Sequence, residues 1–277
     1  MGIKIWWQDI LPSSERSIVG GDAATQKKIQ DKLLGTARKA AREDTVIEVH
    51  NVKYSSYAFN AAYLEMLNNV WIIDGIIEAE TRGYDAAIIG CGNDPGLQEA
   101  RQAVDIPVIG CTEAAMLLAC SLGSKFGVVT VMDEFIPVCE KNIRNYGLGS
   151  RTAGPVRVYQ MGNNPFAALF EMVENPASIN PQFEMLCLEC IDDGAEVIIP
   201  ACASLSPATA LLGYTVVPGT GVPVIDITQA AVKLAETLVD LKRKTGLSKS
   251  QKNAYKSIPA KLRDKMRAAA NCMEKRV

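Results

Sequence analysis

Apolar and polar positions along the chain follow two periods, and together these predict alternating strands and helices. Short apolar runs typical of buried strands lie at 3–7, 46–52, 84–90, 107–109, 126–131, 156–160 and 195–199. Segments whose apolar residues recur every three or four positions predict helices at 24–43, 61–82, 97–104, 112–122, 134–146 and 183–193. Strands that alternate with helices favour parallel sheets, so we expect an α/β fold.

Two stretches of this pattern occur twice, in the same order. GYDAAIIGC, which ends at Cys91, is matched 111 residues later by GAEVIIPAC, which ends at Cys202. PVIGCTEAA at 107–115 is matched by PVIDITQAA at 223–231, with six of nine positions identical. An ordered double repeat indicates two similar parallel-sheet α/β halves, related by pseudo-two-fold symmetry.

The separation of the repeats predicts how the chain is divided. We expect a first half of residues 1–112 plus 218–240 and a second half of residues 113–217. The remaining residues, 241–277, are expected to form a basic helical extension. In this arrangement the active site lies in the cleft between the two halves.

Composition fits a packed protein and separates the extension from the rest. Hydrophobic residues make up 48% of the 277 positions and charged residues 22%, which allows a sizeable core. The net charge is −2, yet residues 242–277 alone carry +10, so the remainder carries −12. A solvated helix or a subunit contact is the expected role of this basic tail, and docking on nucleic acid is the alternative. For the whole protein we expect no nucleic-acid partner.

The chain has the features of a cytoplasmic protein. It contains no apolar run of 18 or more residues, so we expect no membrane association. The start, MGIKIWW, lacks the basic and long apolar regions of a signal peptide. Eight cysteines without the close-set pairs of a zinc site fit a reducing compartment.

Cys91 and Cys202 are the candidate catalytic residues. Each follows a predicted strand directly and precedes a predicted helix, and ligands of open α/β sheets bind at this end of the strands. Backbone N–H groups at a helix start lower the pKa of a thiol and stabilise an enolate as it forms. The only histidine, His50, lies in a predicted strand, which disfavours hydrolase triads and a four-ligand zinc site. We therefore expect no metal and no cofactor, and two thiols that act as acid and base on opposite faces of a carbon atom.

At these positions the chain resembles a known family. Three segments carry the resemblance: CGNDPGLQEAR from Cys91, PVIG and EAA within 107–115, and Cys202-Ala203. They resemble the aspartate/glutamate/hydantoin racemase superfamily, most closely its hydantoin racemase branch. The resemblance covers roughly residues 1–240. It implies a cofactor-independent racemase in which Cys91 and Cys202 perform a two-base 1,1-proton transfer.

The expected reaction is inversion of a carbon centre in a 5-substituted hydantoin or an amino acid. The partner is thus a small molecule with a carbonyl or carboxylate, and the protein is expected to be a homo-oligomer. Residues near the strand ends are predicted to contact the substrate: Gln8, Asn93, Thr130, Ala203 and Ser204. Arylmalonate-type decarboxylation or maleate-type cis–trans isomerisation in the same cleft is the alternative, and a non-catalytic small-molecule binding protein is a third reading.

Overall fold

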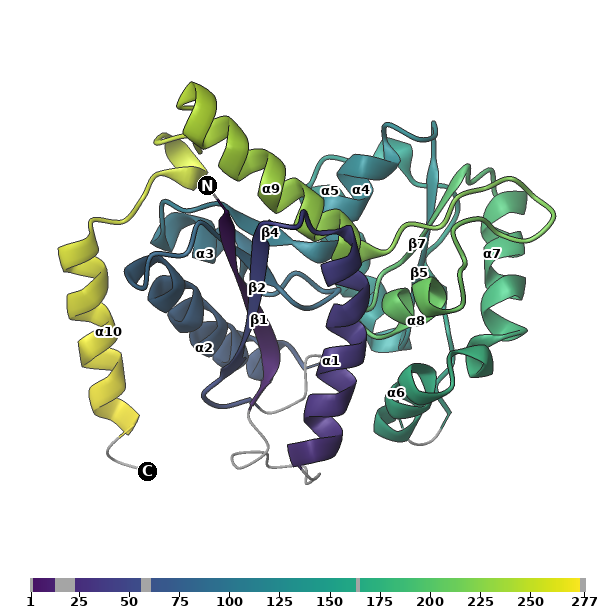
Figure 1. Ribbon diagram of the computed structural model, residues 1–277, viewed down its shortest axis with the longest axis horizontal. Helices are drawn as coiled ribbons and strands as arrows, with labels where there is room; N and C mark the ends of the chain where they lie inside the picture. Colours follow the sequence, from purple (N-terminus) through teal and green to yellow (C-terminus); the bar gives the residue numbers. More distant parts are fainter. Residues whose placement is uncertain (1, 13–22, 56–60, 163–164, 275–277) are drawn as a thin grey trace.

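The computed structural model describes residues 2–12, 23–55, 61–162 and 165–274 (Figure 1). The strands are β1 (Ile3–Pro12), β2 (Thr45–Val52), β3 (Ala86–Ile89), β4 (Val108–Gly110), β5 (Phe126–Thr130), β6 (Arg157–Val158) and β7 (Val197–Pro200). The α-helices are α1 (Ala23–Ala40), α2 (Ala62–Thr81), α3 (Leu97–Ala103), α4 (Cys111–Ala119), α5 (Ile136–Asn145), α6 (Pro165–Glu174), α7 (Gln182–Asp192), α8 (Leu205–Leu211), α9 (Ile227–Thr245) and α10 (Ala260–Glu274).

Two parallel sheets organise these elements. The first sheet has the strand order β2-β1-β3-β4 and the second has the order β6-β5-β7. Every pair of neighbouring strands in both sheets is parallel. The expected α/β fold with parallel sheets is confirmed, and Figure 1 shows the two sheets in separate parts of the molecule.

The two sheets repeat one another in order and in hydrogen bonding. Ala87 N–H donates to the Pro107 carbonyl at 2.9 Å, and Ile198 N–H donates to the Pro223 carbonyl at the same distance. Residues 223–225 thus take the place beside β7 that β4 takes beside β3, but as an isolated bridge at Val224 rather than a strand. The expected division placed 218–240 in the first half, whereas this bridge joins the second sheet. The domain limits themselves stay a prediction.

Side chains of β3, β4, β5 and β7 are buried on both faces, which explains their continuous apolar sequences. Alternate residues point to opposite sides of a strand. Ile88 of β3 and Ile199 of β7 therefore join one large core that also includes residues of α4 and α9. Ile89 faces a second core with α2 and α3, and Ile198 faces a third with α7 and α8. The shared central core fixes the position of one sheet relative to the other.

Two helices connect the sheets. Helix α4 follows β4 and packs against β7 of the second sheet, whereas α9 follows the bridge at Val224 and packs against β3 and β4 of the first sheet. The two helices also contact each other. The chain therefore crosses between the sheets at the second pair of repeated segments. Within the described ranges, no helix is both long and apolar enough to span a membrane.

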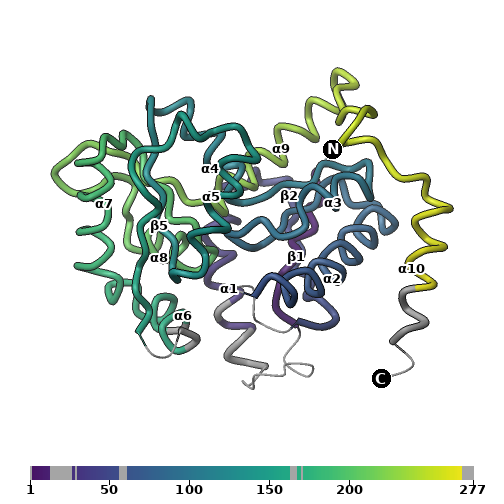
Figure 2. The backbone as a smooth tube through the Cα atoms, turned by 180° about the vertical axis from the view of Figure 1, so that it is seen from behind, coloured from purple at the N-terminus to yellow at the C-terminus, as the bar shows by residue number. Residues whose placement is uncertain are grey.

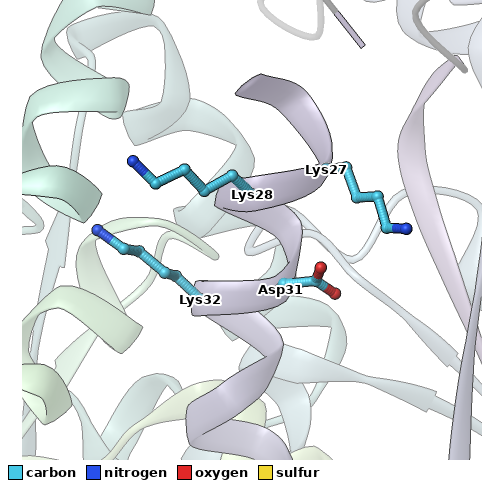
Figure 3. A pocket seen from close by; sticks show the side chains of 4 residues that line it. All are labelled: Lys27, Lys28, Asp31 and Lys32. Carbon is cyan, nitrogen blue, oxygen red and sulfur yellow. The ribbon is translucent and has the colours of Figure 1, made fainter. Parts of the chain in front are cut away.

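Helix α1 lies beside the second sheet's helices and contacts α6 and α8. Lys28 and Lys32 both form ion pairs with Glu174 of α6, at 3.0 Å and 3.1 Å. Figure 3 shows these two lysines extending to one side of α1, while Lys27 and Asp31 point to the other, and all four line an open surface hollow. Exposed ion pairs of this kind contribute little stability. Leu34 and Ala37 of α1 are buried in the large central core.

The basic extension is attached to the first sheet's helices. Figures 1 and 2 show α10 alongside α2, at the side of the molecule away from the second sheet. Arg263 pairs with Glu80 at 3.3 Å and donates to the Ala103 carbonyl at 2.6 Å, and Arg267 pairs with Asp74 at 2.6 Å. The positive charge of the extension is thus partly balanced by carboxylates of α2. This arrangement differs from a fully solvated helix.

Arg263→Ala is expected to lower the free energy of unfolding by about 1–2 kcal/mol, because it leaves Glu80 and the Ala103 carbonyl without this partner. Urea denaturation measures the change. Lys265→Ala is the matched control, since Lys265 is exposed on the same helix, and it should stay within about 0.5 kcal/mol of the parent. Equal effects of both substitutions would contradict a specific attachment through Arg263.

Candidate active site

Cys91 lies in the turn that joins β3 to α3. Its side chain is 8% exposed, and its Sγ accepts a hydrogen bond from the Asn93 N–H at 3.5 Å. The chain turns sharply after the strand, and α3 begins at Leu97. The thiol is therefore held at the carboxyl end of a central strand, close to backbone N–H groups.

Cys202 has the same setting in the second sheet. It follows β7 by two residues, and its Sγ accepts a hydrogen bond from the Ser204 N–H at 3.4 Å. Helix α8 begins at Leu205. Cys202 is half-buried, whereas Cys91 is buried. The sequence repeat thus corresponds to a repeated local geometry in which each sulfur receives the N–H two residues later.

The two cysteine loops are in direct contact. A Cβ atom added to Gly92 would lie 2.3 Å from the Ala201 carbonyl oxygen and 2.9 Å from the Cys202 Cα. Only glycine allows this approach, because any side chain would collide with backbone atoms rather than with a movable side chain. The structure therefore brings together the two residues that the repeat identified, from sequence positions 111 residues apart.

Burial is the main influence on both thiols. It raises the pKa of Cys91 well above its usual range; the Asn93 N–H opposes the rise, and the charges of Cys202, Asp94 and Glu65 add to it. Burial also raises the pKa of Cys202, where the N–H groups of Leu205 and Ser204 oppose the rise. The Coulomb effect of Cys202 on Cys91 shows that deprotonating one thiol disfavours deprotonating the other. The two cysteines are therefore disfavoured from both being thiolates at once.

Cys202 is expected to react with iodoacetamide before Cys91, and both reactions should accelerate as the pH rises. Cys202 is more exposed than Cys91, and two N–H groups oppose the rise in the pKa of Cys202, whereas one opposes it at Cys91. Peptide mass spectrometry after short exposures at pH 7, 8 and 9 measures the two rates separately. Cys190, which is fully buried in α7, serves as an internal control that should stay unmodified. Faster labelling of Cys91 than of Cys202 would contradict this expected order of reaction.

Contacts from both sheets' helices fix the Cys91 loop. The Thr112 hydroxyl donates to the Gly92 carbonyl at 2.6 Å, and the Asn142 amide donates to the Asn93 carbonyl at 2.8 Å. The Asp94 carboxylate accepts from Tyr146 at 2.8 Å. Sequence reasoning missed Asn142 and Tyr146, since no local pattern indicates that α5 reaches across to a loop of the first sheet.

Three of the predicted substrate contacts lie in the two cysteine loops. Asn93 is buried, and its side-chain amide makes no hydrogen bond with the part of the chain that the structure describes. Ala203 and Ser204 are half-buried, and the Ser204 carbonyl accepts from the Ala208 N–H in the first turn of α8. The loops thus present one amide and one hydroxyl close to the thiols, but their role toward a substrate stays a prediction.

The other two predicted contacts have different surroundings. Gln8 is fully buried; its side chain accepts from Trp6 Nε1 at 2.9 Å and donates to the carbonyls of Asp9 and His50. Its amide therefore has internal partners on both sides, and its contact with a substrate stays a prediction. Thr130 ends β5 fully buried, and its side chain interacts with the Cys139 thiol of α5.

Two other thiols and the histidine have structural surroundings. Cys111 donates to the Ile89 carbonyl at 3.1 Å, and Cys139 is buried in α5. His50 stacks on Trp6 with ring centroids 3.3 Å apart, and its Nε2 lies 3.1 Å from the Tyr84 hydroxyl. Burial lowers the pKa of His50, so the ring is neutral at pH 7. No group of three or more His, Cys, Asp or Glu side chains within the described ranges is arranged for a metal ion.

Comparison with curated proteins relates the chain to racemases. Residues 23–235 match the family model described as Asp/Glu/Hydantoin racemase. A hydantoin racemase from Pseudomonas sp. (strain NS671) is 34% identical over 220 residues, which cover 78% of this chain and 83% of that protein. A hydantoin racemase from Rhizobium meliloti is 36% identical over 186 residues, covering 65% and 69%.

Solved structures show the same architecture. The allantoin racemase of Pseudomonas fluorescens superposes with a TM-score of 0.69 at 26% identity, over 92% of this chain and 97% of that one. The allantoin racemase from Klebsiella pneumoniae gives a TM-score of 0.72 at 23% identity, over 93% and 94%, and shows the shared fold. With the family match over most of its length, the chain belongs to the Asp/Glu/hydantoin racemase family of isomerases, on the hydantoin racemase branch.

Proposed function

We propose that the protein racemises 5-substituted hydantoins by proton transfer between Cys91 and Cys202. The observation that carries the proposal is the contact between the two cysteine loops, in which each sulfur accepts the N–H two residues later. Relatives named hydantoin racemase at 34% and 36% identity support this substrate class. A structure of similar fold at 26% identity is named for allantoin, which is itself a 5-substituted hydantoin.

The chemistry requires two groups of opposite protonation on opposite faces of C5. One thiolate takes the C5 proton and becomes a thiol, and the electron pair moves onto the adjacent carbonyl to give an enolate. The other thiol donates its proton to the opposite face of C5 and becomes a thiolate. The substrate is inverted without net gain or loss of a proton, and no redox step is needed.

The backbone around the thiols suits this reaction. Both sulfurs lie at strand ends beside helix starts, where free N–H groups stabilise negative charge. Because burial raises both thiol pKa values, the thiolate is reactive and poorly solvated once formed. We assign the Asn93 amide and the Ser204 hydroxyl to the ring carbonyls, with the small side chain of Ala203 leaving space for the ring. Gln8 and Thr130 are not part of this assignment.

The test is incubation of single enantiomers in deuterium oxide at neutral pH. The panel contains hydantoins with aromatic, aliphatic and ureido substituents, with aspartate and glutamate as amino-acid comparisons. Two-base transfer predicts that, at early times, the inverted product carries deuterium at C5 while the remaining substrate stays unlabelled. Samples without protein correct for spontaneous exchange.

Each alternative gives a different result. Labelling of the remaining substrate as fast as the product indicates a single base. Inversion of aspartate or glutamate, but not of any hydantoin, indicates that the substrate is an amino acid. Absence of exchange with every compound contradicts racemisation of this class. Location in the cytoplasm and assembly as a homo-oligomer stay predictions.

A further inference from the structure

Helix α8, which follows the Cys202 loop, ends in a cap made by its own sequence. Gly213, the second residue after the helix, has a φ of 77°, and its N–H donates to the Ala210 carbonyl at 3.1 Å. The Tyr214 N–H donates to the Thr209 carbonyl at 3.0 Å, which completes the pair of bonds of a Schellman motif. Helices α2, α5 and α7 end in the same left-handed conformation at Gly83, Gly147 and Gly194.

Helix α3, which follows the Cys91 loop, lacks such a glycine. Its second following residue is Asp105, and Val104 before it is already extended, with a φ of −134° and a ψ of 163°. The Val104 N–H donates to the Ala100 carbonyl at 3.2 Å, but a helix leaves its last four carbonyls without partners inside the helix. The other carbonyls at this end therefore need donors from elsewhere in the chain.

The segment 247–259, which connects α9 to α10, supplies these donors together with the start of α10. The carbonyls of residues 101–104 each accept a hydrogen bond from this part of the chain. The Lys249 ammonium donates to two of them, the Ile258 N–H to a third at 3.0 Å, and Arg263 to a fourth at 2.6 Å. The Lys249 side chain is 16% exposed, and its positive charge suits the carboxyl end of a helix.

Helix α3 is tied in turn to the Cys91 loop. Arg101 pairs with both carboxylate oxygens of Glu113 in α4, and its Nη1 lies 2.9 Å from Oε1. The Glu113 N–H donates to the Asp94 carboxylate at 2.8 Å, and the Asp94 N–H donates to the Cys91 carbonyl at 3.2 Å. Because Lys249 holds the carbonyl of Arg101, a continuous series of contacts joins Lys249 to the Cys91 loop.

We propose, resting on the proposed function, that Lys249 is a positioning residue whose ammonium supplies the C-terminal cap of α3 and so holds the Cys91 loop in place for proton transfer. Helix α3 has seven residues, whereas an isolated helix needs roughly 12–15 to be stable, so its position depends on the contacts at its two ends. The segment 247–259 lies outside residues 23–235, which match the family model. The positioning is therefore an addition to the part of the chain shared with the family.

The first experiment follows hydrogen–deuterium exchange in the full-length protein without substrate. Peptide mass spectrometry compares residues 91–104 with residues 202–212, which contain the other cysteine loop and α8. Lys249→Met removes the donor but keeps the length of the side chain, and Lys249→Arg retains a charged donor. Lys252→Met, at an exposed lysine of the same segment, is the matched control. Arg263→Ala, which removes the donor to the Ala103 carbonyl, is the second variant if Lys249→Met does not fold.

Lys249→Met is expected to accelerate exchange in 91–104 by at least about tenfold, because two charge-assisted hydrogen bonds no longer oppose local opening. Exchange in 202–212 should change less than about twofold, since α8 carries its own cap. Lys249→Arg should keep exchange in 91–104 within about threefold of the parent, and Lys252→Met within about twofold.

The second experiment measures initial rates of hydantoin racemisation by the same variants. Lys249→Met is expected to lower kcat by about tenfold or more and to change KM by less than about threefold, because a displaced reacting group slows the bound substrate's reaction. Lys249→Arg should restore most of kcat, and Lys252→Met should match the parent. A residue that only stabilises the fold would leave kcat unchanged in protein that is still folded.

Unchanged exchange in 91–104 in folded Lys249→Met protein overturns the inference. Equal acceleration in 202–212 overturns it as well, because the effect then comes from general loosening of the fold. An unchanged kcat despite faster exchange contradicts the positioning role. If the parent protein racemises no hydantoin, the proposed function fails by itself, and exchange in 91–104 still decides whether Lys249 holds the Cys91 loop.

Discussion

Cys91→Ser and Cys202→Ser are each expected to reduce hydantoin racemisation by a factor of at least about 10³, within the range that a positioned acid or base contributes. A serine hydroxyl occupies nearly the same space as a thiol but is a far weaker acid, so it neither forms the base nor donates the proton efficiently. Polarimetry with each enantiomer of one hydantoin measures the loss. Circular dichroism checks that the fold is retained.

Isotope exchange in each single variant tests the role of the remaining cysteine separately. In Cys91→Ser, the enantiomer whose C5 proton faces Cys202 should still exchange that proton with deuterium oxide, without inversion. In Cys202→Ser, the opposite enantiomer should exchange. Cys120→Ser, a half-buried thiol that lies at the end of α4, is the control and should keep full activity. Racemisation that survives either catalytic replacement above a tenth of the parent rate would favour racemisation by a single base.

The second large effect is expected from Gly92→Ala. The new Cβ would lie 2.3 Å from the Ala201 carbonyl oxygen, so the two cysteine loops must move apart. A displacement of about 1 Å between reacting groups costs on the order of 10²-fold in rate. Both thiols are retained, so the loss would arise from their separation alone. Initial rates under saturating and limiting hydantoin measure it.

Gly35→Ala is the matched control for a change from glycine to alanine. A Cβ at Gly35, within α1, would have no heavy atom within 4 Å, and alanine favours a helix by up to about 1 kcal/mol over glycine. Activity should be unchanged and stability equal or higher. If Gly92→Ala also keeps full activity, the contact between the loops does not position the thiols.

Much of the fold could be predicted from local sequence. Strand segments such as 46–52 and 126–131 agree closely with β2 and β5. β5 is buried on both faces and leaves a continuous apolar run, whereas β2 is only partly buried and is indicated by its alternating β-branched residues. Glycine after a helix marked the end of α2 and α5, where Gly83 and Gly147 have positive φ. Helix α6 was not predicted, and 223–225 forms only a bridge, since a three-residue strand depends on its neighbour for hydrogen bonds.

The site was predictable in part for a similar reason. A strand that ends in cysteine and repeats after 111 residues is visible in the sequence, and parallel strands bring their carboxyl ends to one edge. Gln8 illustrates what local sequence misses. It ends an apolar run as a substrate contact would, but its amide is held by Trp6 and His50 from the same sheet. Trp6 lies on β1 itself, but the His50 carbonyl belongs to the adjacent strand β2, so the residues around Gln8 do not reveal this second partner.

The sequence by itself determined the α/β class, the duplication and the two cysteines, because each of these is visible as a local hydrophobic periodicity or as a repeated segment. Only the tertiary structure decided that Gly92 lies against Ala201, that Asn142 and Tyr146 hold the first loop, and that the Asp94 carboxylate of this loop caps the start of α4. These facts depend on contacts between residues far apart in sequence, and such contacts are set by how the two sheets pack on α4 and α9. The pair of thiols can thus be predicted from the sequence, whereas the difference in their burial arises from packing.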